Sequence, residues 1–275
     1  MRALFTAALA LATTITLLFL ALPVAALFLR VSPGDLVSSL GSSVARDAMV
    51  VSLKTNLIAE ALIVVIGTPA AYLLARRRFR GRALVLTLVE LPLVLPPAVG
   101  GIALFAAFGR TGLVGDELNA LGFSIPFTQA AVVFAVTFVA APFYVRPAVA
   151  AFESLDQSVL DAARTLGAGP GRVFGRVALP LATGALGAAA AVAFARGLGE
   201  FGATIMFAGS LQGVTQTLPL AIYAEFAREP DGFQLALALG ALLVVISFAI
   251  LLSVKLVPSW TRYALTLPFR SATSS

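Results

Sequence analysis

The chain of 275 residues contains no cysteine and no histidine. These two absences exclude disulfide bonds, thiolate clusters, zinc sites and His-based catalytic sets, so no metal site and no enzymatic activity are expected. Charge is also scarce, because Asp, Glu, Lys and Arg make up 12% of the residues whereas 60% are hydrophobic. A soluble domain carries about 25% charged residues. The composition is therefore that of an integral membrane protein.

In place of charge, the chain has a series of apolar runs of about 20 residues, a length typical of transmembrane helices and about twice that of barrel strands. Six spans are predicted, at residues 3–29, 53–75, 83–108, 129–151, 180–198 and 235–257. The expected fold class is an all-α integral membrane protein, with residues 1–275 forming a single transmembrane domain.

Two of these spans have special features. The first follows Met1-Arg2 and could be a secretory signal, but signals have apolar cores of about 7–15 residues. This run is longer, so we interpret it as an uncleaved span. The third span contains prolines that free backbone carbonyls at membrane depth. A simple kink and a functional break both explain them, and in either case the span should face protein. These prolines are Pro92, Pro96 and Pro97.

The basic residues favour one orientation. With the N-terminus inside, twelve Lys and Arg residues lie on the cytoplasmic side and five on the opposite side. Because cytoplasmic loops carry an excess of Lys and Arg, both termini are expected in the cytoplasm. The largest basic group is residues 76–82, where five of seven residues are arginine. Its place between two spans indicates a membrane anchor, so no nucleic-acid partner is expected.

Residues 153–180 form the longest stretch after the first polar loop that cannot lie in hydrocarbon. Asp156 is of a type that caps helices, and Gly167 is placed to end one. The apolar positions on one face between them are Val159, Ala163 and Leu166. Gly-Pro-Gly at 169–171 predicts a turn, and Pro180 suits the first turn of the next span. The pattern predicts a short amphipathic docking helix between spans four and five.

The chain has no recognisable source of energy for transport. The pattern GxxxxGK[ST] is absent, so the chain cannot bind nucleotide phosphates in that way, and no cofactor of its own is expected. Glu60 and Glu90 are single acids on different spans, whereas a proton or sodium relay needs paired groups. We expect each to lie near an interface or to be satisfied by a neighbour. Energy for uphill transport must then come from another polypeptide, received through residues 153–180.

At this point the residues resemble a known signature. Asp161-Ala162-Ala163, then Gly167, then Val177 and Leu179-Pro180 are similar to the EAA, G, I-x-L-P signature of ABC importer permeases, with the same spacing. Asp for Glu and Val for Ile are the departures. The resemblance implies the type I importer permease fold and a coupling helix that fits a groove on an ATPase subunit. The implied coupling positions are Asp161, Ala162, Ala163, Arg164, Leu166, Gly167 and Ala168.

Similarity to the molybdate branch of these permeases extends from about residue 50 to 250. The stretches that carry it are residues 91–97, 162–168, 199–209 and 215–223. Sulfate and thiosulfate permeases are close relatives that usually have a tyrosine in the Gly-Glu-Phe-Gly stretch, so Phe201 favours molybdate or tungstate over sulfate. A pathway or gate role is assigned to Pro96, Pro97, Gly199, Glu200, Phe201, Gly202 and Thr204.

The resemblance also implies partners in the inner or plasma membrane of a prokaryotic cell. These are a second copy of the chain, two cytoplasmic ABC ATPase subunits that hold ATP-Mg, an extracytoplasmic oxyanion-binding protein, and membrane lipid. Arg146 and Arg196 are the basic residues in or near the late spans. Either one of them lies beside the anion path, or they reach an interface or pair with Glu200, and we favour the second interpretation. A stand-alone carrier or channel, which needs no partner, is the alternative.

Overall fold

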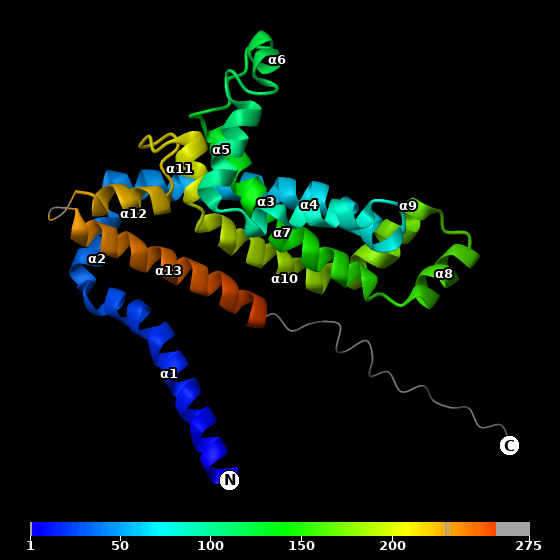
Figure 1. Cartoon of the computed structure of the whole chain (residues 1–275), viewed down its shortest axis with the longest axis horizontal. Helices are drawn as coiled ribbons and strands as arrows, with labels where there is room; N and C mark the ends of the chain where they lie inside the picture. Colours follow the sequence, from blue (N-terminus) through cyan, green and yellow to red (C-terminus); the bar gives the residue numbers. More distant parts are fainter. Residues whose placement is uncertain (1, 229, 231, 257–275) are drawn as a thin grey trace.

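The computed structural model describes residues 2–228, 230 and 232–256 (Figure 1). These residues are largely helical and contain no strand, so the all-α class is confirmed. The elements in chain order are α1 (Arg2–Leu29), α2 (Pro33–Leu40), α3 (Ser43–Arg76), α4 (Arg82–Val94), α5 (Pro97–Phe108), α6 (Gly115–Ala120), α7 (Gln129–Glu153), α8 (Gln157–Thr165), α9 (Pro170–Val173), the π-helical turn η1 (Phe174–Ala178), α10 (Leu179–Leu198), α11 (Gly202–Ala208), α12 (Leu218–Phe226) and α13 (Phe233–Leu256). The predicted end of the last span at Val257 and the tail with Arg262 and Arg270 lie outside the described residues.

Within the described part of the chain, five helical runs are long and apolar enough to cross a membrane, and a sixth crossing forms if α4 and α5 count as one. The five are α1, α3, α7, the run Pro170–Leu198, and α13. α4 and α5 meet at a bend of 118°. Leu95 and Pro96 at this bend have extended backbone, because a proline disfavours helical geometry in the residue before it. The prolines therefore break the third span rather than kink it slightly.

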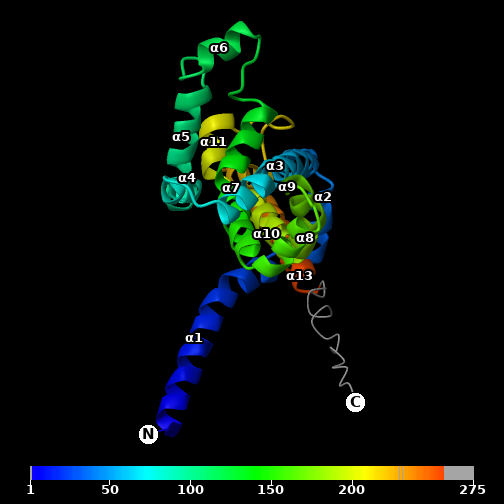
Figure 2. The same ribbon diagram turned by 90° about the vertical axis from the view of Figure 1, so that its right-hand side faces the viewer.

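α7 lies at the centre of the bundle, with α3 and α10 along it (Figure 1, Figure 2). In its apolar window 61% of residues are buried, against at most 33% in the other spans. A small residue lets α3 approach closely, since a Cβ on Gly67 would lie 3.1 Å from Val145. The Thr68 hydroxyl is 2.6 Å from the Tyr144 hydroxyl. Apolar packing and one internal hydrogen bond thus hold α3 to α7.

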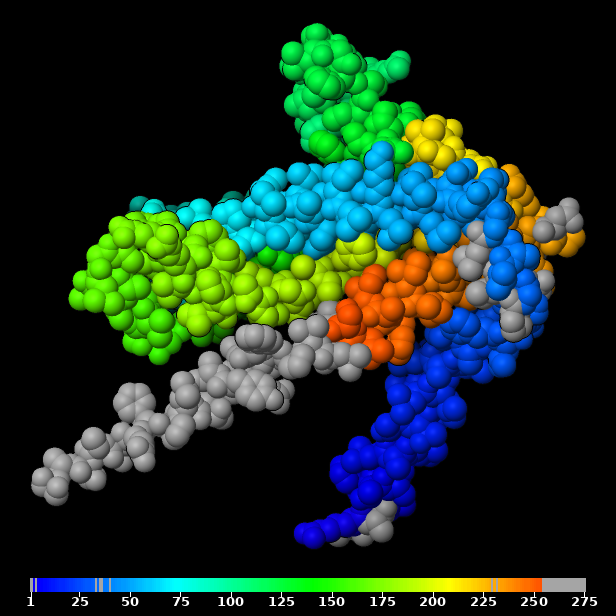
Figure 3. All heavy atoms as spheres, turned by 180° about the vertical axis from the view of Figure 1, so that it is seen from behind, coloured from blue at the N-terminus to red at the C-terminus, as the bar shows by residue number. Residues whose placement is uncertain are grey.

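α1 differs from the other spans because it projects away from the body of the molecule (Figure 2, Figure 3). None of its apolar window is buried by the rest of the chain. A helix that is apolar all round needs cover on every side. Lipid or another polypeptide must therefore surround α1.

The segments between the spans contain more helix than predicted. α2 and the first turns of α3 occupy the loop expected before residue 53, α6 lies in the loop expected after residue 108, and α11 and α12 lie in the segment after Glu200. α3 begins early because the Ser42 side chain caps it, accepting a hydrogen bond from the Ala45 N–H at 3.1 Å. The cap satisfies a backbone N–H in the first turn of the helix. The predicted span followed the apolar run alone and therefore began later, at residue 53.

Pro180 lies in the first turn of α10, as expected, but α10 does not follow a break in the helix. The helical run continues from Pro170 through η1 into α10. In η1 the Leu179 N–H bonds to the carbonyl of Phe174, five residues back. A proline removes an N–H and crowds the carbonyl four residues before it, and a wider π turn accommodates this. The last part of the docking segment, from Pro170 onward, therefore forms one helical run with the following span.

Candidate coupling segment and pathway residues

The helix predicted between the fourth and fifth spans is α8. The Asp156 carboxylate caps it, accepting a hydrogen bond from the Ser158 N–H at 2.9 Å, and this bond lowers the pKa of Asp156 below its usual value. At the other end Gly167 has a φ of +84°. The N–H groups of Gly167 and Ala168 donate to carbonyls in the last turn of α8, at 2.9 and 3.0 Å. This arrangement is a Schellman motif, so both predicted ends of the helix are confirmed.

The side chain that anchors α8 is Leu160, which the sequence pattern did not single out. Leu160 is fully buried in a cluster that includes Phe152 and Val173. Val159 and Leu166, two of the three positions expected on the apolar face, are exposed, and Leu166 is 87% exposed. Two adjacent apolar residues in a nine-residue helix leave the buried face undecided until the neighbours are known. α8 therefore buries one leucine and presents other apolar side chains outward.

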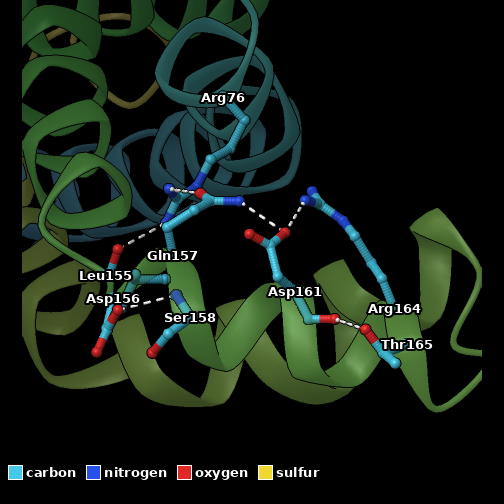
Figure 4. Close-up of polar contacts among 8 residues, drawn as sticks. All are labelled: Arg76, Leu155, Asp156, Gln157, Ser158, Asp161, Arg164 and Thr165. Atoms are coloured by element: carbon cyan, nitrogen blue, oxygen red, sulfur yellow. Dashed lines mark hydrogen bonds and ion pairs between the residues drawn. The ribbon is translucent and has the colours of Figure 1, made fainter.

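Polar contacts fasten α8 to the end of α3 (Figure 4). Arg76 of α3 donates to the Gln157 side chain at 3.0 Å and to the Leu155 carbonyl at 3.3 Å. Gln157 in turn donates to Asp161 at 3.0 Å. Arg164 donates to the same Asp161 oxygen at 2.6 Å. Asp161 of the predicted signature therefore bonds two other side chains of α8, and Arg76 of the basic run holds α8 to α3.

Two ion pairs join α4 to α7. Arg82 pairs with Glu153 where the two helices meet beside α8, and Glu90 pairs with Arg146 further in. The expectation that Glu90 is satisfied by a neighbour is confirmed. Glu60 differs, because its Oε1 atom is buried and has no hydrogen-bond partner among the described residues.

A third ion pair lies where α10 gives way to α11. Glu200 is buried, and its Oε2 atom is 2.7 Å from Nη2 of Arg196. Its Oε1 atom accepts a hydrogen bond from the Ala203 N–H at 2.8 Å. The Arg196 guanidinium also lies 5.9 Å from the centre of the Phe143 ring. Of the alternatives for Arg196, pairing with Glu200 is thus the one observed.

Glycines allow α5 and α11 to cross at close range. A Cβ on Gly202 would lie 2.7 Å from the Pro97 side chain. A Cβ on Gly101 would lie 2.6 Å from the Ala203 carbonyl oxygen. Both distances are shorter than real Cβ contacts, so only glycine fits. The structure therefore brings two predicted pathway residues, Pro97 and Gly202, into direct contact.

The other predicted pathway residues do not gather at one point. Phe201 and Gly199 line an apolar pocket of about 340 Å³ next to α12, and the Phe201 ring centre is 5.2 Å from that of Tyr223. Thr204 is fully buried, and Pro96 lies at the bend between α4 and α5. The seven residues form a packed junction with a pocket on one side rather than a single ligand cradle.

Two polar residues of α3 were missed. Asn56 donates to the Phe194 carbonyl at 3.0 Å and lies against Gly197, where a Cβ would come within 2.2 Å of its side chain. Ser52 accepts a hydrogen bond from the Leu218 N–H at 2.7 Å. Asn56 therefore bonds a backbone carbonyl in the last turns of α10, and Ser52 bonds the first N–H of α12. Their four-residue spacing in an apolar span was the available signal.

A central, buried span surrounded by others, a broken span, and a short helix docked beside the bundle are the features of a multi-pass helical membrane protein. The chain belongs to the family of binding-protein-dependent transport system inner membrane components, whose model matches residues 63–263. The predicted family and importer-permease fold are thereby confirmed.

Relatives of known name support this assignment. The chain is 45% identical over 238 residues to the molybdenum transport system permease protein ModB of Mycobacterium bovis, covering 86% of this chain and 89% of that protein. It is 38% identical over 215 residues to the ModB protein of Escherichia coli K12, covering 78% and 92%. A chain of the bacterial alginate ABC transporter, solved in complex with an alginate pentasaccharide-bound periplasmic protein, has a TM-score of 0.75 at 18% identity, covering 92% and 93%. At that identity the structural likeness shows the fold alone.

Proposed function

We propose that the chain is the membrane-spanning permease subunit of an ATP-driven importer of molybdate. The observation that carries the substrate is the 45% identity, over 86% of the chain, to a protein named for molybdenum transport. Residues 199–209, which resemble the molybdate branch, form the packed α10–α11 junction in this structure. Tungstate has the same tetrahedral shape and charge and is expected to share the path.

We further propose that α8 transmits the motion of an ATPase subunit. Its support is the combination of a rigid mount, through Arg76 and the Gly167 turn, with exposed apolar side chains at Val159 and Leu166. These two side chains offer apolar surface that a partner protein would cover. The proposed contact and turn residues are Asp161, Ala162, Ala163, Arg164, Leu166, Gly167 and Ala168. With the N-terminus inside, α8 and both termini lie in the cytoplasm. The arginines near α8 favour this orientation.

The complete importer in this proposal contains two copies of the chain, two ATPase subunits that bind ATP-Mg, and an extracytoplasmic oxyanion-binding protein. The family description supports the binding protein, since its members are components of binding-protein-dependent systems. The α10–α11 junction would lie towards the outside and act as a gate. Its proposed residues are Pro96, Pro97, Gly199, Glu200, Phe201, Gly202 and Thr204.

The test is reconstitution of the chain in liposomes with its ATPase and binding protein. ATP hydrolysis and uptake are measured with molybdate-loaded, sulfate-loaded and empty binding protein. We expect stimulation by the molybdate-loaded form and little by the sulfate-loaded form. Stimulation by sulfate alone would keep the mechanism and change the substrate, whereas failure to associate with an ATPase would favour a stand-alone carrier.

A further inference from the structure

α7 is the most enclosed span, yet one strip of it is uncovered. Between residues 131 and 152, all of which are described, the exposed residues are Arg146, Pro147 and Ala150. Positions three and four apart share one face of a helix, so Ala150 lies on the same face as Arg146 and Pro147. The opening in the cover of α7 therefore displays a guanidinium group.

This guanidinium lies within the predicted fourth span, about two helical turns from the end of α7. The Arg82–Glu153 pair sets the ends of α4 and α7 level, with the two helices antiparallel. Glu90 and Arg146 lie about 12 Å and about 10 Å further in, at a rise of about 1.5 Å per residue. The two charges therefore meet at the same depth, with Nε of Arg146 on Oε1 of Glu90.

The pair is far from buried by its own chain. The Arg146 side chain is 52% exposed and that of Glu90 is 35% exposed. Charged side chains within a membrane are costly against lipid, and they face a bundle interior or a water-filled cavity. The uncovered strip of α7 must therefore face water or another protein rather than lipid. In a permease for a dianion, a water-filled surface inside the bundle is the substrate's path.

We propose that Arg146 lies on this path and binds the tetrahedral oxyanion in transit, while Glu90 is its counter-ion when the path is empty. This inference rests on the proposed function. A guanidinium has five N–H donors in a planar fork that suits two oxygens of one anion. A contact through Nε leaves the terminal nitrogens to donate to such a ligand.

The carboxylate makes this a site of transit rather than of storage. Glu90 competes with the oxyanion for the same guanidinium, which keeps the anion weakly held and able to leave. The Glu90 side chain is 35% exposed, so it has room to turn away from Arg146 when the anion binds. The Arg196–Glu200 pair is different, because the Glu200 side chain is 1% exposed and also accepts a backbone N–H. That second pair is structural.

The first test uses the absence of native cysteine. In the assembled importer in lipid nanodiscs, Ala150→Cys is treated with a charged, membrane-impermeant thiol reagent. Leu17→Cys, in the uncovered helix α1, is the control for a lipid-facing position. We expect Ala150→Cys to react and Leu17→Cys to stay unmodified. Molybdate should slow the Ala150→Cys reaction severalfold, and Arg146→Gln should abolish that protection without stopping the reaction.

Two results would overturn the inference: no reaction at Ala150→Cys, or protection by molybdate that persists in Arg146→Gln. The proposed substrate is tested separately by uptake through the unmodified importer. If that importer carries sulfate and not molybdate, the substrate proposal fails, and sulfate becomes the protecting probe for Arg146.

Transport by variants distinguishes a ligand from a structural pair. We expect Arg146→Gln to reduce molybdate uptake about tenfold or more, as for a lost hydrogen bond to a charged group, while ATP hydrolysis still responds to loaded binding protein. Arg146→Lys should recover part of the uptake. Glu90→Gln, which removes the competing carboxylate, should let molybdate protect Ala150→Cys at a lower concentration, with a smaller loss of uptake than Arg146→Gln. Equal losses in Arg146→Gln and Glu90→Gln would show that the pair merely holds α4, and would refute the proposal.

Discussion

Two carboxylates in this protein each accept a hydrogen bond from the backbone at the start of a short helix, in opposite surroundings. Asp156 caps α8 at an exposed position and needs no cation for this role. Glu200 bonds the first turn of α11 in the interior and is paired with Arg196. Water solvates the first charge, whereas burial of the second requires an ion pair. The same capping chemistry thus yields a surface segment in one case and a fixed internal junction in the other.

The contrast extends to the glycines of the two regions. A Cβ on Gly167 would meet nothing within 4 Å, so this glycine is required only by its positive φ. Gly202 has the reverse requirement, because its backbone is ordinary but Pro97 leaves no room for a side chain. α8 is therefore specified by its own backbone, and the junction by its neighbours.

The largest effect should follow from Arg196→Gln, which leaves the Glu200 carboxylate buried without its cation. We expect a loss of about 3–5 kcal/mol in stability, measured by thermal unfolding of the purified protein in detergent. Asp156→Ala, at the exposed cap, should cost about 1 kcal/mol. The double variant Arg196→Gln/Glu200→Gln should recover much of the loss. Equal stability of Arg196→Gln and the unmodified protein would remove the distinction between the two caps.

Gly202→Ala should lower stability by about 1–3 kcal/mol, the usual cost of overpacking a tight contact. The added methyl group would lie 2.7 Å from Pro97, so α5 and α11 must separate. Gly187→Ala in α10 is the matched control, because a Cβ there meets nothing within 4 Å. Thermal unfolding compares the two. Similar midpoints would mean that the α5–α11 crossing adjusts freely.

Gly167→Val should act locally. A β-branched residue in the left-handed region costs about 1–2 kcal/mol, which should disturb the turn after α8 and leave the membrane helices folded. We expect ATP hydrolysis in the reconstituted importer to lose its coupling to uptake. Gly167→Asn, which tolerates this backbone conformation, should retain coupling. Unchanged transport in Gly167→Val would remove the coupling assignment of α8.

Leu166→Ala should have the smallest effect on the chain itself. The side chain is 87% exposed, so thermal stability should not change, but binding to the ATPase subunit should weaken by about 1 kcal/mol or more if Leu166 enters its groove. A binding titration measures this. Leu160→Ala should instead expose α8 amides to hydrogen exchange, because it removes the buried anchor. If neither variant binds the ATPase subunit more weakly than the unmodified protein does, the docking surface lies elsewhere.

Local signals predicted a large part of this structure. Long apolar runs located the spans, and Asp156 and Gly167 located both ends of α8, because capping and chain reversal depend on a few adjacent residues. The buried face of α8 was not predictable, since Leu160 and Val159 are equally apolar. Nor was the 118° bend, because prolines show that a helix breaks but not the direction it then takes.

By itself the sequence determined the class of the protein: absent His and Cys, scarce charge, apolar runs and the permease signature all depend on residue identity and spacing along the chain. Only the tertiary structure decided which charges meet. Glu90 and Arg146 are 56 positions apart and come together because α4 and α7 lie antiparallel. Exposure of the pair depends on what the other helices leave uncovered. Burial and long-range pairing are properties of packing, so no local pattern records them.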